Sequence, residues 1–183
     1  MIELLRKRRS IRKYSCKPID KKTVALLLES LLRAPSSRNI KPCEFIIVDE
    51  PELLSQLAEA KEHGSQFLRN AQLGIVVCAD ETRSDVWVED SSIASILVQM
   101  AAQSLGLGSC WIQIRKRKHG EKITAERYVK KLLGLPPHLK IESIISIGHP
   151  GETKKPVPKS ALDYGKVRYN HYSVQYCAKK VTL

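Results

Sequence analysis

The chain contains 183 residues, of which 43% are hydrophobic and 27% are charged. This length and composition are typical of one globular domain with its own core, and they exclude a disordered tail, a fibrous repeat and a disulfide-stapled scaffold. The formal net charge of +12 favours an anionic partner, such as nucleic acid, an acidic membrane or a phosphorylated ligand.

The positions of the cysteines and the first residues of the chain indicate the cellular compartment in which we expect the protein. Five cysteines, at positions 16, 43, 78, 110 and 177, show no Cys-x-x-Cys spacing. We therefore expect free or buried thiols in a reducing cytoplasm, with no zinc or other metal site. Charged residues interrupt the first six positions, so we expect no secretory signal. The uncharged stretch 91–114 contains five serines and three glutamines, which predicts a buried helix and a strand instead of a membrane span.

Hydrophobic spacing and helix-capping residues predict the elements of the first half of the chain. Asp20 is a good N-cap, and Pro51 suits the first position of a helix. In chain order we expect a helix at 2–9, an extended segment at 10–14, a helix after Asp20 that ends before Pro35, a polar loop at 35–42, a strand at 45–48, a helix from Pro51 to about Lys61, a loop at 64–70 and a strand at 73–79.

The second half continues the alternation of helices and strands. We expect a loop at 82–87, a central helix to Leu105, a strand at 111–114, a helix at 125–133 closed by Gly134, a strand at 141–147 and an extended arm from Gly148. This order indicates an α/β or α+β chain with a central sheet. No change of composition divides the chain, so we expect a single domain over 1–183.

Four segments carry the candidate chemistry. In an extended segment Arg8, Ser10 and Arg12 share one face, and two guanidinium groups beside a hydroxyl suit a phosphate dianion. The alternative is a solvated basic run. The other three segments are the polar turn 35–39, the glycine turn 106–111 and the tail from Gly148 to Lys159. Their alternatives are a plain turn for the first, a helix C-cap with a tight turn for the second and a soluble basic arm for the third.

A fifth segment, the basic run Arg115–His119, is the best candidate for a nucleic-acid contact. Only 5% of the residues are aromatic, and no helix-turn-helix, RNA-recognition or KH signature is present. We therefore expect a surface loop here and no nucleic-acid partner.

Taken in order, the four segments resemble the FMN-dependent nitroreductase family over nearly the whole chain. The matching pieces are Arg8–Arg12, Ala34–Asn39 with Pro42, Leu105–Ile112, and Ile147–Pro150 with the lysines that follow. The resemblance implies an α+β sandwich with a mixed or antiparallel sheet flanked by helices. It also implies a homodimer with FMN at the interface, in which an arm of about residues 160–183 wraps the partner and adds a strand to its sheet.

The resemblance further implies which residues form the site. The FMN phosphate and ribityl chain would contact the first basic segment and a tail lysine, with Lys154 competing for the lysine role. The partner subunit would supply the polar turn. The implied cofactor-binding residues are Arg8, Arg9, Ser10, Arg12, Pro35, Ser36, Ser37, Asn39, Cys110, Trp111, Ile112, Lys155 and Lys159. Three positions that depart from the commonest family pattern, Arg38, Lys41 and Cys43, would border the substrate opening.

The activity implied is an FMN-dependent NAD(P)H oxidoreductase in the cytoplasm. NADH or NADPH would pass hydride to flavin N5, and a nitroaromatic, quinone or related acceptor would then take the electrons in a ping-pong cycle. Because the flavin carries this chemistry, no catalytic side chain is nominated. The alternatives are a specialised flavin enzyme of the same fold, of the dehalogenase or flavin-fragmenting type, a flavin-binding sensor or store, and a basic nucleic-acid-binding module.

Overall fold

The computed structural model describes residues 1–175, and it contains five α-helices, four short 3-10 helices and six strands within that range. The α-helices are α1 (Ile2–Lys7), α2 (Lys21–Leu32), α3 (Pro51–Ala58), α4 (Trp87–Ser104) and α5 (Ala125–Leu133). The strands are β1 (Cys43–Val48), β2 (Leu73–Asp80), β3 (Gly108–Gln113), β4 (Leu139–Gly148), β5 (Arg168–Tyr169) and β6 (His171–Gln175). The 3-10 helices are η1 (Ser37–Asn39), η2 (Gln66–Asn70), η3 (Lys159–Ala161) and η4 (Tyr164–Lys166).

The main sheet has the strand order β1-β2-β4-β3. Every neighbouring pair is antiparallel, and in the central pair Ile75 lies opposite Ile145. The only parallel pairing within residues 1–175 is an isolated bridge between Ser10 and Ser109 at the outer edge of β3. The sheet is therefore antiparallel and not mixed.

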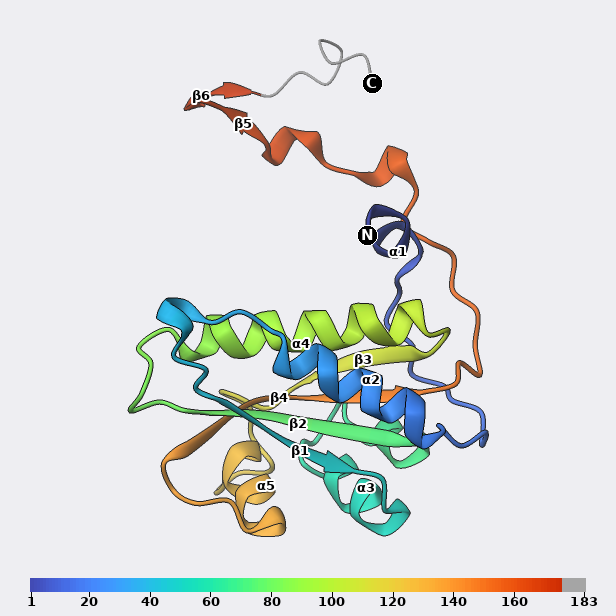
Figure 1. Ribbon diagram of the computed structural model, residues 1–183, viewed down its shortest axis with the longest axis vertical. Helices are drawn as coiled ribbons and strands as arrows, with labels where there is room; N and C mark the ends of the chain where they lie inside the picture. Colours follow the sequence, from blue (N-terminus) through green and yellow to red (C-terminus); the bar gives the residue numbers. More distant parts are fainter. Residues whose placement is uncertain (176–183) are drawn as a thin grey trace.

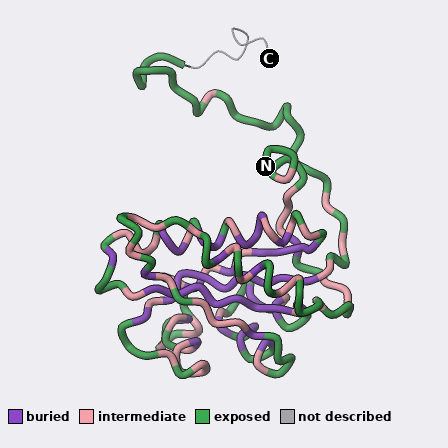
Figure 2. The backbone as a smooth tube through the Cα atoms, viewed as in Figure 1, coloured by how far each residue is buried: buried purple, intermediate pink, exposed green. Residues whose placement is uncertain are grey.

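Helices cover both faces of this sheet (Figure 1). Side chains of β2 and β4 alternate between two cores, one formed with α2 and α4 and the other with α3 and α5. Residues Leu73–Ala79 are buried throughout, which confirms the prediction of a strand covered on both faces (Figure 2).

Several predicted boundaries are confirmed. The Asp20 carboxylate accepts a hydrogen bond from the Thr23 N–H at 2.9 Å and caps α2, Pro51 opens α3, and Gly134 ends α5 with a φ of 68°.

Several boundaries were wrong. The first helix ends at Lys7 and not at Arg9, β1 begins at Cys43 and not at Phe45, and β4 spans 139–148 and not 141–147. The helix from Pro51 ends at Ala58 and not near Lys61, because the buried Ser65 hydroxyl donates to the Ala58 carbonyl at 2.7 Å and turns the chain. The third strand spans 108–113 and not 111–114, because Gly108 already pairs with Gly148 of β4.

Residues 151–155 are still bonded to the segment 9–13, and only beyond them does the tail leave the body of the molecule as an arm (Figure 1). It contains η3, η4 and the β5–β6 hairpin, which the sequence pattern did not predict. Its apolar side chains are largely exposed, with Tyr169 57% and Tyr172 87% accessible. The last part of the expected arm, residues 176–183 with Cys177, lies outside the described residues.

Across the part of the chain that the structure describes, no helix has the length and apolar character needed to cross a bilayer.

Candidate functional site

The basic segment near the start of the chain is held against the edge strand β3. The Ile11 N–H donates to the Ser109 carbonyl at 3.0 Å, beside the bridge between Ser10 and Ser109. Ile11 is buried so close to Gly108 that a Cβ atom on the glycine would lie 2.8 Å from the Ile11 side chain. In the glycine turn, Gly108 is therefore packed against Ile11. This anchor fixes the extended conformation in which Arg8, Ser10 and Arg12 share a face.

The first residues of the tail fold over the same segment. The Glu152 carboxylate accepts the N–H groups of Arg12 and Lys13, at 2.7 and 3.2 Å. The Lys154 ammonium donates to the Ser10 carbonyl at 2.8 Å and lies 3.0 Å from the Glu152 carboxylate. These hydrogen bonds, the Arg12 N–H first, lower the pKa of Glu152. The two segments thus form one unit, although they are far apart in the sequence.

Three cations converge on the start of β3. Burial raises the pKa of the Cys110 thiol. The charges of Arg12, Lys154 and Arg8 and a hydrogen bond with Ser10 act in the opposite direction. All four residues therefore lie within electrostatic reach of one buried sulfur atom. We call Arg8, Ser10, Arg12 and Lys154 the basic cluster. Guanidinium and ammonium groups in this arrangement suit a phosphate dianion.

Two residues that sequence reasoning missed hold the basic cluster in place. Glu152 is the acidic residue that fastens the tail to the first segment. Tyr14 donates its hydroxyl to the Ile11 carbonyl at 2.7 Å and lies 2.7 Å from the Ser146 hydroxyl, and its burial raises its pKa. Nothing in their local sequence distinguishes these residues, because their partners come from other parts of the chain.

The tail lysines occupy three different environments. Lys154 enters the basic cluster, whereas Lys155 is exposed and contributes its backbone carbonyl to the Arg9 guanidinium. Lys159 lies in η3 and lines a groove of about 540 Å³ between α1 and the arm, next to Arg8 and Leu5. Within one chain, the tail lysine whose side chain lies at the first basic segment is therefore Lys154, whereas we expected Lys155 to contact the phosphate there.

The second group of predicted residues forms the loop between α2 and β1. The Ser37 N–H donates to the buried Asp90 carboxylate at 2.9 Å, and the Lys41 N–H donates to the Ser36 hydroxyl at 2.8 Å. Arg38, Asn39 and Lys41 have φ values of 52°, 55° and 51°, a left-handed conformation that is unusual for these residue types. Hydrogen bonds to α4 and within the loop thus impose its shape.

A small cavity of about 70 Å³ lies beneath this loop. It is lined by Pro35, Ser36, Lys41, Cys43 and Asp90, among others. Burial raises the pKa of Cys43, whose sulfur lies 3.6 Å from the Ser91 hydroxyl. In the same loop the Arg38 guanidinium pairs with the exposed Asp85 carboxylate at 2.7 Å.

The basic cluster and the α2–β1 loop lie at opposite ends of α4 (Figure 1). This helix has 18 residues and therefore spans about 27 Å. A single chain does not bring the two groups together.

Cys110, Trp111 and Ile112 run along β3 at the edge of the main sheet. The side chains of Cys110 and Ile112 are buried, at 2% and 0% exposure. The Trp111 indole N–H donates to the Gln113 side-chain oxygen at 2.9 Å and the ring packs towards α4. These three residues can therefore contact a ligand chiefly through their backbone groups at the edge of the sheet.

Comparisons with known proteins agree with this architecture. The Nitroreductase family pattern matches residues 5–63 and 54–149. The solved structure of an FMN-dependent nitroreductase from Clostridium difficile R20291 superposes with a TM-score of 0.92 at 45% identity, covering 94% of this chain and 100% of that one.

Two curated relatives extend the comparison. An Archaeoglobus fulgidus protein, provisionally named NADH dehydrogenase/NAD(P)H nitroreductase, is 37% identical over 157 residues, which is 84% of this chain and 87% of that protein. The FMN reductase [NAD(P)H] of Bacillus subtilis is 28% identical over 194 residues, which covers 93% of this chain and 75% of that enzyme. With its helix-flanked antiparallel sheet and a family match that covers most of its length, this chain belongs to the nitroreductase family.

Proposed function

We propose that this chain is an FMN-dependent NAD(P)H oxidoreductase that acts as a homodimer. The observation that carries the proposal is that Glu152 and Lys154 of the tail bond to the backbone of residues 10–13 at the edge of β3, which brings Lys154 to the segment that contains Arg8 and Arg12. Similar family members are an FMN-dependent nitroreductase and an FMN reductase.

The charges of the basic cluster fit the phosphate of FMN. Glu152 is the acid bonded to the cluster, and it already accepts hydrogen bonds from two backbone N–H groups and from Lys154. The guanidinium groups of Arg8 and Arg12 therefore keep positive charge that a phosphate dianion would neutralise. In this proposal Arg8, Arg12 and Lys154 hold the phosphate, and Ser10 contacts the ribityl chain.

The second copy of the chain would complete the site. Because the α2–β1 loop lies at the far end of α4 from the basic cluster, Pro35, Ser36, Ser37 and Asn39 would approach the flavin from the partner. The exposed apolar side chains of Ile93 and Ile96 on α4 and of the arm favour such a partner surface. The arm would wrap around the second copy.

The cofactor would supply the redox chemistry, accepting hydride from NADH or NADPH and passing electrons to a nitroaromatic, quinone or related acceptor. The residues of this chain would bind the cofactor and orient it. The edge-strand backbone at Cys110, Trp111 and Ile112 would flank the ring. Arg38, Lys41 and Cys43 would border the opening that admits donor and acceptor in turn.

The visible absorption spectrum of the purified protein tests this proposal. We expect flavin bands, release of FMN on denaturation, and bleaching by NADH or NADPH under nitrogen. Initial rates should then give parallel double-reciprocal lines, because donor and acceptor occupy the same place in turn. A colourless protein that takes up no added FMN would refute the proposal, and converging lines would reject the shared place.

A further inference from the structure

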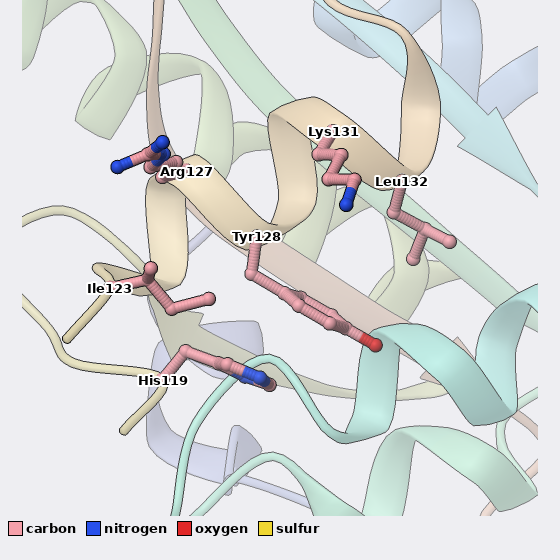
Figure 3. A pocket seen from close by; sticks show the side chains of 6 residues that line it. All are labelled: His119, Ile123, Arg127, Tyr128, Lys131 and Leu132. Carbon is pink, nitrogen blue, oxygen red and sulfur yellow. The ribbon is translucent and has the colours of Figure 1, made fainter. Parts of the chain in front are cut away.

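A further pocket lies on the other side of the sheet, at α5. It has a volume of about 630 Å³, within the range of small-molecule sites. Figure 3 shows the side chains that line it, which are His119, Ile123, Arg127, Tyr128, Lys131 and Leu132. None of these residues belongs to the basic cluster or to the α2–β1 loop, and α5 packs in the core opposite α4.

The pocket has a rigid aromatic wall. The rings of His119 and Tyr128 stack with centroids 4.0 Å apart and an interplanar angle of 14°. His119 Nδ1 lies 2.8 Å from the Glu59 carbonyl, and the Tyr128 hydroxyl donates to the Gln56 carbonyl at 3.0 Å. Because a carbonyl only accepts, His119 carries its proton on Nδ1. Both rings are thus anchored to the end of α3 before any ligand arrives, which reduces the entropic cost of binding.

Two cations beside this wall have no partner among residues 1–175. Arg127 and Lys131 are spaced i,i+4 on α5 and are exposed, and no described residue accepts a hydrogen bond from either side chain or pairs with it. Their neighbour Lys130 differs, because it pairs with the Glu126 carboxylate at 3.5 Å and donates to the Pro137 carbonyl at 3.1 Å. The unpaired charges are therefore available to an anion.

The surroundings strengthen the positive potential of the pocket. Residues 115–133 contain eight of the 31 Lys and Arg residues of the chain but only two of its 19 acidic residues. Such a concentration of one sign raises the local concentration of anions. The remaining lining residues, Ile123 and Leu132, provide apolar contact area at the sides of the aromatic wall.

We propose that this pocket binds a planar aromatic ring that carries a phosphate group, which is the chemistry of a free nucleotide. The ring lies against Tyr128, Ile123 and Leu132, and the phosphate lies between Arg127 and Lys131. Stacking and charge-assisted hydrogen bonds then act on two parts of one molecule. The proposal is independent of the flavin function, because it uses other residues on the other face of the sheet.

Calorimetric titration with adenosine 5′-monophosphate tests the proposal. The protein is first loaded with FMN, and unbound FMN is removed by gel filtration, so that the phosphate site proposed in the basic cluster is filled while no free FMN competes for the pocket. We expect the nucleotide to bind more tightly than adenosine or inorganic phosphate alone. The double variant Arg127→Gln/Lys131→Gln should weaken nucleotide binding by about tenfold or more, because it removes two charge-assisted contacts.

The matched control is Lys116→Gln/Lys118→Gln, which removes the same two charges from exposed side chains outside the pocket. This control should bind the nucleotide as the parent does. Equal weakening in both double variants, or inorganic phosphate binding as tightly as the nucleotide, would show only a diffuse charge effect and would overturn the proposal.

Nuclear magnetic resonance adds a positional readout. Nuclear Overhauser effects between the base protons of the nucleotide and the methyl groups of Ile123 or Leu132 are expected, and contacts elsewhere on the protein would overturn the assignment. A protein that takes up no added FMN would refute the proposed function, but the nucleotide titration could still be performed on it and interpreted.

Discussion

The ammonium group of Lys154 lies 2.8 Å from the carbonyl oxygen of Ser10. This contact places a residue of the tail inside the basic segment that opens the chain. The Glu152 carboxylate binds both sides of the junction, because it accepts the Arg12 N–H and pairs with Lys154. Two segments far apart in the sequence therefore meet against one edge strand, at the place where we propose that the phosphate binds.

The double variant Arg8→Ala/Arg12→Ala should lose bound FMN while keeping the fold. Each charge-assisted hydrogen bond to a phosphate contributes about 1.5–3 kcal/mol, so the dissociation constant of FMN should rise by about 100-fold or more. FMN content after gel filtration and the far-ultraviolet circular dichroism spectrum measure the two effects. Lys21→Ala/Lys22→Ala removes two exposed cations at the start of α2 and should retain FMN. Normal FMN content in the arginine variant would contradict the phosphate assignment.

Lys154→Met and Lys155→Met should separate two neighbouring lysines. The Lys154 side chain enters the basic cluster, whereas Lys155 contributes a backbone carbonyl that the substitution preserves. We expect Lys154→Met to weaken FMN binding by about tenfold and Lys155→Met to leave it close to the parent value. Fluorescence titration of the protein with FMN provides the dissociation constants. The reverse order of effects would mean that Lys155 reaches the phosphate in the dimer.

Gly108→Ala should destabilise the protein through Ile11. The added Cβ would lie 2.8 Å from the Ile11 side chain, well inside the usual carbon–carbon contact distance. Crowding of this kind lowers the free energy of unfolding by about 1–3 kcal/mol. Urea unfolding measures the change. Gly120→Ala is the control, because a Cβ there meets no atom within 4 Å, and an equal loss in both variants would argue against the Ile11 contact as the cause.

A chain that ends after Lys159 should form a weaker dimer. The deletion removes exposed apolar side chains that include Leu162, Val167 and Tyr169, and in the proposed dimer these side chains would contact the partner. Sedimentation equilibrium should show a dimer dissociation constant raised by about tenfold or more. A dimer of unchanged stability would exclude a wrapping arm.

Protonation of Glu152 should loosen the basic cluster in acid. Hydrogen bonds from the Arg12 N–H and Lys154 lower the pKa of Glu152 below its ordinary value of 4.5. The folded state therefore favours the ionised carboxylate. Its contribution to stability is present above the unfolded-state pKa and is lost as the pH falls through the lower folded-state pKa.

The variant Glu152→Gln isolates this contribution. Urea unfolding at a series of pH values should show a smaller acid-induced loss of stability in the variant than in the parent below about pH 4.5. Identical pH profiles would show that Glu152 is not linked to folding.

The sequence by itself determined the order and most of the ends of the secondary-structure elements. Asp20, Pro51 and Gly134 act on backbone groups within one turn of their own positions, so a local pattern is sufficient to predict them. The apolar run Leu73–Ala79 likewise shows that both faces of its strand are covered. The family could also be recognised, because its motifs are short and keep their order along the chain.

Only the tertiary structure decided which side chains meet. It brought the Lys154 ammonium to the Ser10 carbonyl, placed Glu152 and Tyr14 beside the same segment, and anchored the His119 and Tyr128 rings to the end of α3. It also separated the two halves of the predicted site by the length of α4. Contacts of this kind join residues far apart in the sequence, and they depend on how the strands pair and the helices pack. Such contacts cannot be predicted from the spacing of residues along one segment.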